Sequence, residues 1–185
     1  MRTRHRATSL LSVLALAGAA SPSLAAPTLR VQVDQRGDFL LVGNTLGYEC
    51  TSPVTPVVGT VGACGTNLND SAADIYWRSQ SPTATEAQAN TSITAAQARS
   101  TALLSIPPGA TVTHAYLYWG ANNSSNVADT QVTLDRPGGF SQTVNGVSLG
   151  LISDSYHVVA DVTPIVQAQG SGQYRVADVA MANFV

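Results

Sequence analysis

Lysine is absent from this sequence, and charged residues of all kinds make up only 11% of it. The nine basic residues are therefore all arginines, and eleven acidic residues bring the formal net charge to −2. Proteins that bind nucleic acid neutralise phosphates with clustered Lys and Arg side chains. Beyond the first few residues the sequence has no such cluster, which predicts that nucleic acid is not a partner.

Apolar runs long enough to cross a bilayer as a helix, roughly 20 residues, are also absent. The shorter run Ala7–Ala20 follows three arginines and precedes the small residues Ser23 and Ala25. This pattern is typical of a secretory signal peptide, which we place at residues 1–25. Removing its three arginines changes the net charge from −2 to −5. We therefore expect a secreted, cell-surface or periplasmic protein with no membrane span in the mature chain.

Cysteine is scarce, with only Cys50 and Cys64. An even pair in an exported chain predicts a disulfide bond. It would close a loop of about fifteen residues that contains two prolines and has no helical periodicity. Closing a loop of that size contributes roughly 3 kcal/mol through the unfolded state.

Helical periodicity is rare, whereas short alternating segments bounded by turn residues recur along the chain. This pattern predicts an all-β fold, a jelly-roll-like β-sandwich over residues 26–185. One helix is expected near 164–169, with Thr163 as N-cap, Pro164 in the first turn and Gly170 after the end. The predicted strands are 29–33, 38–44, 75–78, 101–106, 111–119, 130–135, 140–144, 147–152, 156–160 and 174–180.

Three further local features carry expectations. Asn145-Gly146 separates two strand-like runs and predicts a tight hairpin, because such turns need positive φ at both positions. Residues 81–92, rich in Thr, Ala, Ser, Gln and Asn, are expected to form a loop. The chain stops on the apolar Val185 without a polar tail, which predicts a fragment truncated at its C-terminus.

Aromatic residues make up only 6% of the sequence, yet three of them lie within Tyr116–Trp119. Alternation in a strand puts His114, Tyr116 and Tyr118 on one face, and Leu117 and Trp119 on the other. Leu117 and Trp119 are therefore predicted to face the core. Together with Trp77, Tyr116 and Tyr118 are the candidates for ligand contact, because tyrosine combines an apolar ring with a polar tip.

Catalytic patterns are present only in incomplete form. Gly146–Gly150, GVSLG, matches a nucleophile elbow with Ser148 as nucleophile, but the elbow requires a helix after the serine and a strand-like run follows here. Ser155, His157 and Asp161 could be combined as a triad, but residues two apart in a strand are side-by-side neighbours rather than opposed partners. We therefore predict no catalytic residues and no enzyme.

A metal site has one candidate. Asn67, Asn69, Asp70 and Asp74 offer the oxygen ligands that Ca²⁺ prefers. Their spacing lacks the EF-hand pattern, and a polar turn stabilised by Asx hydrogen bonds is the alternative. No other cofactor is expected.

Several segments resemble a known family. These include VQVDQRGDFLLVGNTLGYEC (31–50), SIPPGATVTHAYLYWGA (105–121) and VADVTPIVQAQGSGQYRVADV (159–179). The chain is similar to the N-terminal region of large secreted myxobacterial-type proteins known as adventurous gliding motility proteins. The resemblance implies an extracellular or surface-associated module and associates no catalytic residues with these segments. It also implies that relatives continue past the point where this chain stops.

Taken with the predicted export, these features favour a non-enzymatic extracellular module acting in adhesion, gliding motility or matrix assembly. Its partner would be a surface protein or a polysaccharide. The alternatives are a carbohydrate-binding module that uses exposed aromatic residues and a serine hydrolase acting through Ser148.

Overall fold

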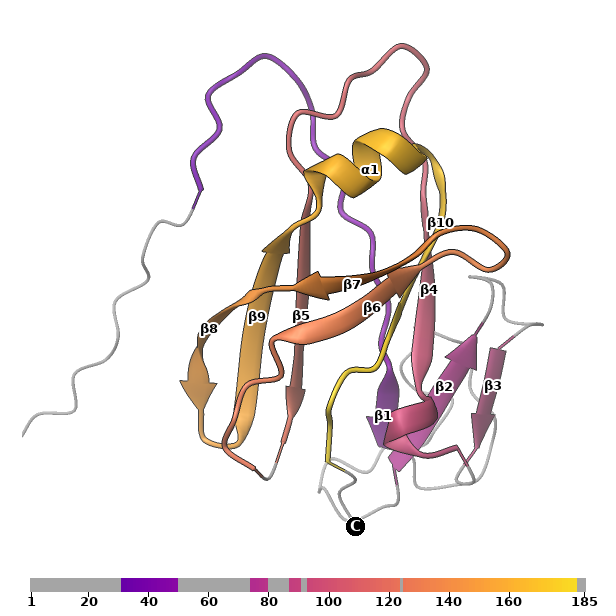
Figure 1. Cartoon of the computed structure of the whole chain (residues 1–185), viewed down its shortest axis with the longest axis vertical. Helices are drawn as coiled ribbons and strands as arrows, with labels where there is room; N and C mark the ends of the chain where they lie inside the picture. The colour runs from indigo at the N-terminus through magenta and orange to yellow at the C-terminus, as the bar shows by residue number, and fades with distance from the viewer. Residues whose placement is uncertain (1–30, 50–73, 80–86, 91–92, 124, 183–185) are drawn as a thin grey trace, which may run out of the picture. The chain divides into compact units, whose positions relative to one another are not determined.

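A computed structural model describes residues 31–49, 74–79, 87–90, 93–123 and 125–182 (Figure 1). The predicted signal peptide, residues 1–25, lies outside this range. The chain divides into two units, Met1–Asp38 and Phe39–Val185. In the first unit, residues 31–38 contain no helix or strand. The second unit holds two β-sheets and one α-helix among its described residues, which confirms the predicted all-β, sandwich-like fold.

The larger sheet, sheet A, has seven strands in the order β1-β2-β4-β10-β6-β7, with β3 also paired to β2. Its pairings are antiparallel except for the parallel pairing of β2 with β4. Its strands are β1 (Gly47–Glu49), β2 (Asp74–Ser79), β3 (Ala87–Asn90), β4 (Arg99–Leu104), β6 (Gln131–Asp135), β7 (Ser141–Asn145) and β10 (Gly172–Ala177).

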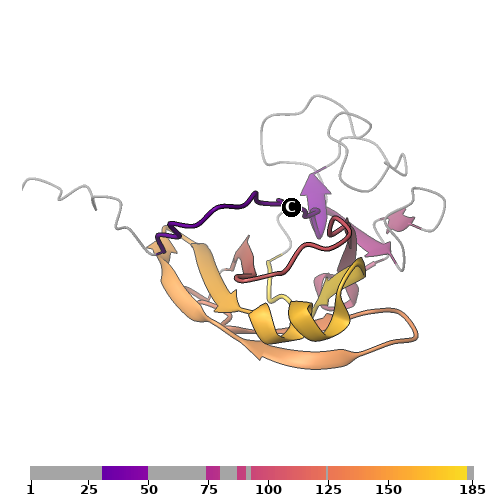
Figure 2. The ribbon, with the colours of Figure 1, turned by 90° about the horizontal axis from the view of Figure 1, so that it is seen from above.

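The smaller sheet, sheet B, has three antiparallel strands in the order β5-β9-β8. They are β5 (Tyr116–Asn122), β8 (Val147–Ile152) and β9 (Ser155–Asp161). Helix α1 (Thr163–Gln169) follows β9 and leads into β10, so it carries the chain from sheet B to sheet A at one end of the two sheets (Figures 1 and 2). A short 3-10 helix, η2 (Ala95–Gln97), precedes β4.

The main core lies between the two sheets. Strands β6 and β7 of sheet A and β5 and β9 of sheet B bury alternate side chains in it, as the pleat requires. Full burial of one such side chain contributes about 1.5–3 kcal/mol. The buried core residues are Trp119, Val132, Leu134, Val144, Tyr156, Val158, Ala160, Val162, Val166 and Val179.

Two core aromatic residues also satisfy their polar atoms. The indole Nε1 of Trp119 donates to the Asp129 carbonyl at 2.8 Å. The buried hydroxyl of Tyr156 donates to the Ala180 carbonyl at 2.7 Å. Burial, followed by the nearby Asp129 carboxylate, raises the pKa of Tyr156, so its phenol stays protonated and able to donate.

Helix α1 confirms the helix predicted near 164–169, but its first residues play different roles. Val162, not Thr163, is the N-cap, and no side chain caps the helix. The Thr163 hydroxyl instead accepts a hydrogen bond from the Ala115 N–H at 2.8 Å, which joins the start of the helix to the segment before β5. Gly170 ends the helix with φ 61° and donates its N–H to the Val166 carbonyl, as predicted for a glycine C-cap.

Three predictions of local structure are wrong. The described part of the strand predicted at 29–33, residues 31–33, forms no strand. Residues 39–46 form no strand, although 38–44 was predicted as one, and Leu41 is 90% exposed. Residues 87–90, predicted as loop, form strand β3. Pairing explains β3: AQAN has no apolar alternation, but β2 supplies its hydrogen-bonding partner.

The hairpin predicted at Asn145-Gly146 is also wrong. Strand β7 pairs with β6 in sheet A, and β8 pairs with β9 in sheet B, so this dipeptide is the crossing between the sheets. Neither residue has positive φ. Glycine is needed at position 146 for a different reason, because a Cβ there would meet the Trp119 ring, Cγ1 of Val158 at 2.6 Å and the Val159 carbonyl at 2.7 Å.

This packing predicts the effect of Gly146→Ala. The added methyl group must push aside Trp119 or the β9 backbone, and overpacking of this kind costs about 1–3 kcal/mol. Urea unfolding followed by circular dichroism should show that loss. The control is Gly43→Ala, since a Cβ at Gly43 has nothing within 4 Å and the residue lacks positive φ. Equal unfolding free energies for the two variants would show that the Trp119–Gly146 contact does not constrain the fold.

Candidate functional site on sheet B

One side of sheet B faces away from the core, and we call it the outer face of sheet B. Because Trp119 on β5 and Tyr156, Val158 and Ala160 on β9 face the core, the residues between them point outward. Cross-strand pairs share a face, so the register extends this side to β8. The outer face of sheet B consists of Tyr116, Tyr118, Gly120, Asn122, Val147, Gly150, Ile152, Ser155, His157, Val159 and Asp161.

The aromatic residues of β5 divide as predicted. Trp119 is 7% exposed and Leu117 packs against the same core, whereas Tyr118 is 57% exposed on the outer face. Tyr116 is half-buried, and the His114 ring stacks on it with centroids 6.4 Å apart and planes at 21°. One side of the Tyr116 ring is therefore occupied, which leaves Tyr118 as the more accessible platform.

His157 lies between two glycines on the neighbouring strands. In the register, Gly120 of β5 and Gly150 of β8 both stand opposite His157. A Cβ at Gly120 would lie 2.5 Å from the Tyr156 carbonyl oxygen and 3.0 Å from Nδ1 of His157, so the imidazole lies over the Gly120 backbone. A Cβ at Gly150 would have nothing within 4 Å. The exposed imidazole thus has open space beside it.

Asp161 supplies a carboxylate at the end of the same face, opposite Tyr116. Hydrogen bonds from the Thr163 hydroxyl and then from its backbone N–H, which lies 2.9 Å from Oδ1, lower the pKa of Asp161, and His114 adds a smaller lowering effect. Asp161 is fully exposed and ionised at neutral pH, where it can accept hydrogen bonds from a ligand.

Ser148, the candidate nucleophile, lies on β8 opposite Val158 rather than opposite His157. Ser148 lies within β8, and the next element is strand β9 rather than the helix that a nucleophile elbow requires. The elbow geometry is therefore absent here. Its Oγ accepts a hydrogen bond from the Gly150 N–H at 3.3 Å. Ser155, His157 and Asp161 all project from one face of β9, the side-by-side arrangement predicted for them.

The remaining predicted site residues lie wholly or partly outside the described part of the chain. Trp77 lies on β2 in sheet A, and its side chain is outside the described part of the chain. Asp74 begins β2, while Asn67, Asn69 and Asp70, like the predicted disulfide partners Cys50 and Cys64, lie outside the described residues. Within the described residues no three potential metal-ligating side chains lie close together. The calcium and disulfide predictions concern residues that are mostly outside that part of the chain, and they stay predictions.

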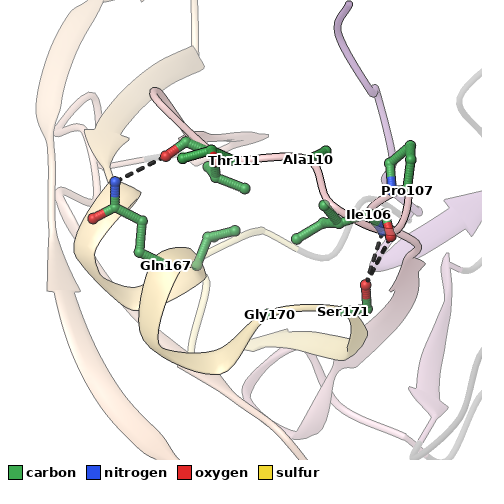
Figure 3. Close-up of a pocket in the computed structure, with 9 residues that line it drawn as sticks. Ile106, Pro107, Ala110, Thr111, Gln167, Gly170 and Ser171 are labelled. Carbon is green, nitrogen blue, oxygen red and sulfur yellow. Dashed lines mark hydrogen bonds between the residues drawn. The ribbon is translucent and has the colours of Figure 1, made fainter.

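A shallow recess of about 470 Å³ lies between α1 and the segment before β5 (Figure 3). Two of its polar side chains already bond the opposite wall. Gln167 Nε2 donates to the Val112 carbonyl at 2.8 Å, and the Ile106 N–H donates to Ser171 Oγ at 2.9 Å. These bonds tie the segment to the helix and its following turn, which indicates a structural role for the recess.

His157 enters the sequence-based predictions only as a triad candidate, and the exposed Val147 and Ile152 do not enter them as site residues. A local signal exists for His157, since it alternates with the buried Tyr156 and Val158. Its glycine neighbours come from β5 and β8, so only the strand order reveals them.

Comparisons with protein-family models, curated proteins and solved structures give no match to this chain. In the described part of the chain, no helix has both the length and the apolar character needed to cross a membrane.

The lowered pKa of Asp161 predicts a pH-dependent stability difference between the wild type and Asp161→Asn. A depressed folded-state pKa stabilises the fold above the unfolded value of 3.8, and this contribution disappears as pH falls through the folded value. Thermal melts should therefore show the wild type more stable than the variant at pH 6, with the gap narrowing as the pH falls below about 4. A gap that stays constant over that range would contradict the hydrogen-bonding role of Thr163.

Proposed function

We propose that this chain is an exported, non-enzymatic module of a cell-surface or extracellular protein that acts in adhesion, gliding motility or matrix assembly. Its contact surface is the outer face of sheet B. The observation that carries the proposal is the exposure of large side chains there: Tyr118 is 57%, Val147 70% and Ile152 74% exposed. Exposed apolar and aromatic side chains that gather on one face are typical of interaction sites.

The opposite outer face, that of sheet A, has a different chemistry. On β6 and β7 its side chains are polar, namely Gln131, Thr133, Asp135, Ser141, Thr143 and Asn145, and some bond one another, as Gln131 Nε2 does to Asn145 Oδ1 at 2.9 Å. Asp135 and Arg175 form a buried, bidentate ion pair on that face. Arg175 Nε lies 2.6 Å from Asp135 Oδ1, and Arg175 Nη2 lies 2.7 Å from Asp135 Oδ2. Polar groups bonded to each other offer less to a partner, which favours sheet B as the contact surface.

Three further observations support the proposal. The signal-peptide pattern of residues 1–25 supports export, and the family resemblance supports a surface role. The position of Ser148 within strand β8, as its second residue and opposite Val158, supports a module without serine-hydrolase chemistry.

The proposal predicts which substitutions release the protein from its surface. Fluorescently labelled full chain is added to cells of the producing organism and to their extracellular matrix, and the retained fraction is measured. Tyr118→Ser combined with Ile152→Ser should lower retention at least tenfold, because both changes remove exposed apolar contacts. Thr143→Ala, an exposed position on the outer face of sheet A, should leave retention unchanged.

Equal retention of the wild type and the double variant would contradict the assignment of the contact surface. Labelling of Ser148 by a fluorophosphonate probe, with loss of the label in Ser148→Ala, would contradict the non-enzymatic part of the proposal.

A further inference from the structure

Resting on the contact surface proposed above, we propose that the outer face of sheet B binds a neutral polysaccharide. Tyr118 is the platform on which a sugar ring stacks, and His157 and Asp161 hydrogen-bond its hydroxyl groups from opposite sides. Three features of the face support this ligand: the order of its polar and apolar rows, the space around His157, and the distribution of charge.

The first feature is the order of rows across the sheet. Tyr118, Val159 and Val147 are register partners and form one apolar row. Asp161 lies two residues beyond Val159 on β9 and His157 two residues before it, so each polar group stands about 6.5–7 Å from the apolar row. A sugar ring has an apolar C–H face and a rim of hydroxyl groups. An exposed aromatic ring between two hydrogen-bonding groups complements both parts of that ring.

The second feature is accessibility. The glycines opposite His157 leave its imidazole as the only side chain in its row, and the space above Gly150 is open. A ligand lying on Tyr118 can therefore extend over this row without meeting another side chain there. Tyr116 contributes less stacking surface, since His114 already covers one side of its ring.

The third feature is charge. Residues 39–185 contain no lysine and four arginines, all of them in sheet A or its connections: Arg78 on β2, Arg99 on β4, Arg136 between β6 and β7, and Arg175 on β10. The side chains of two of these arginines already bond other groups of the protein: Arg136 Nε donates to the Gln173 carbonyl at 2.9 Å, and Arg175 pairs with Asp135.

The outer face of sheet B thus has a carboxylate and no arginine to balance it. An acidic polysaccharide, a nucleic acid or an anionic lipid would meet the Asp161 carboxylate with no arginine or lysine on this face to offset it, which disfavours all three. A cationic peptide is disfavoured for a different reason, since a single carboxylate gives it one ion pair at the surface, worth at most about 1 kcal/mol. The charge of this face therefore favours a neutral ligand over an anionic or a cationic one.

The test is affinity electrophoresis of the full chain through native gels that contain one dissolved polymer each. The neutral polymers are a mixed-linkage β-glucan, a galactomannan, a xyloglucan and a soluble α-glucan; the charged ones are alginate and polylysine. We expect retardation by at least one neutral polymer and by neither charged polymer. Tyr118→Ala should weaken that retardation at least tenfold and His157→Ala about three- to tenfold, whereas Tyr118→Phe, which keeps the ring, should stay within twofold of the wild type.

Thr143→Ala is the matched surface control and should migrate as the wild type does, and circular dichroism checks that each variant folds. Migration unaffected by every neutral polymer, retardation that Tyr118→Ala leaves unchanged, or stronger retardation by alginate or polylysine would overturn the inference. If no neutral polymer binds but surface retention still depends on Tyr118 and Ile152, the sugar inference fails and the proposed function stands. If retention is also independent of them, both fail.

Discussion

The indole of Trp119 packs against the bare backbone of Gly146 at the point where the chain leaves sheet A for sheet B. Its Nε1 also donates to the Asp129 carbonyl, ahead of β6, so one side chain links strand β5 of sheet B to the segment that leads into sheet A. These contacts fix which alternate side chains of β5 face the core and which face outward. With Trp119 fixed toward the core, the pleat turns Tyr118 outward, and everything proposed for the outer face of sheet B follows from that orientation.

The charged and exposed apolar side chains are distributed unequally between the two sheets. Sheet A and its turns hold every arginine of residues 39–185, and Asp135 and Arg175 neutralise each other there. The outer face of sheet B carries the exposed tyrosine, the two exposed aliphatic residues Val147 and Ile152, an imidazole and an ionised carboxylate. This separation makes one outer face polar and largely bonded to itself, while the other keeps apolar surface beside open hydrogen-bonding groups. The proposed recognition of a partner rests on this second face.

Much of this arrangement could be predicted from the sequence. The alternation around Trp119 predicted its burial and the exposure of Tyr118, and the Thr-Pro…Gly pattern predicted α1, because both signals are local. The failures involve contacts between distant segments. Gly146 was interpreted through backbone conformation, but it is required by a ring that lies 27 positions earlier in the sequence. In the same way, β3 exists because β2 pairs with it, and His157 gains its open surroundings from glycines on two other strands.

The most direct test of the central claim, that β5 sends Trp119 inward and Tyr118 outward, is hydroxyl-radical footprinting read residue by residue with mass spectrometry. The two side chains are adjacent in sequence, so they share local chemistry and differ mainly in the face they occupy. Tyr118 should be oxidised at a rate close to that of an exposed tyrosine, while Trp119, despite its higher intrinsic reactivity, should be protected until the protein unfolds. Oxidation of native Trp119 as fast as that of Tyr118 would contradict this orientation of the two side chains and the contact surface built on it.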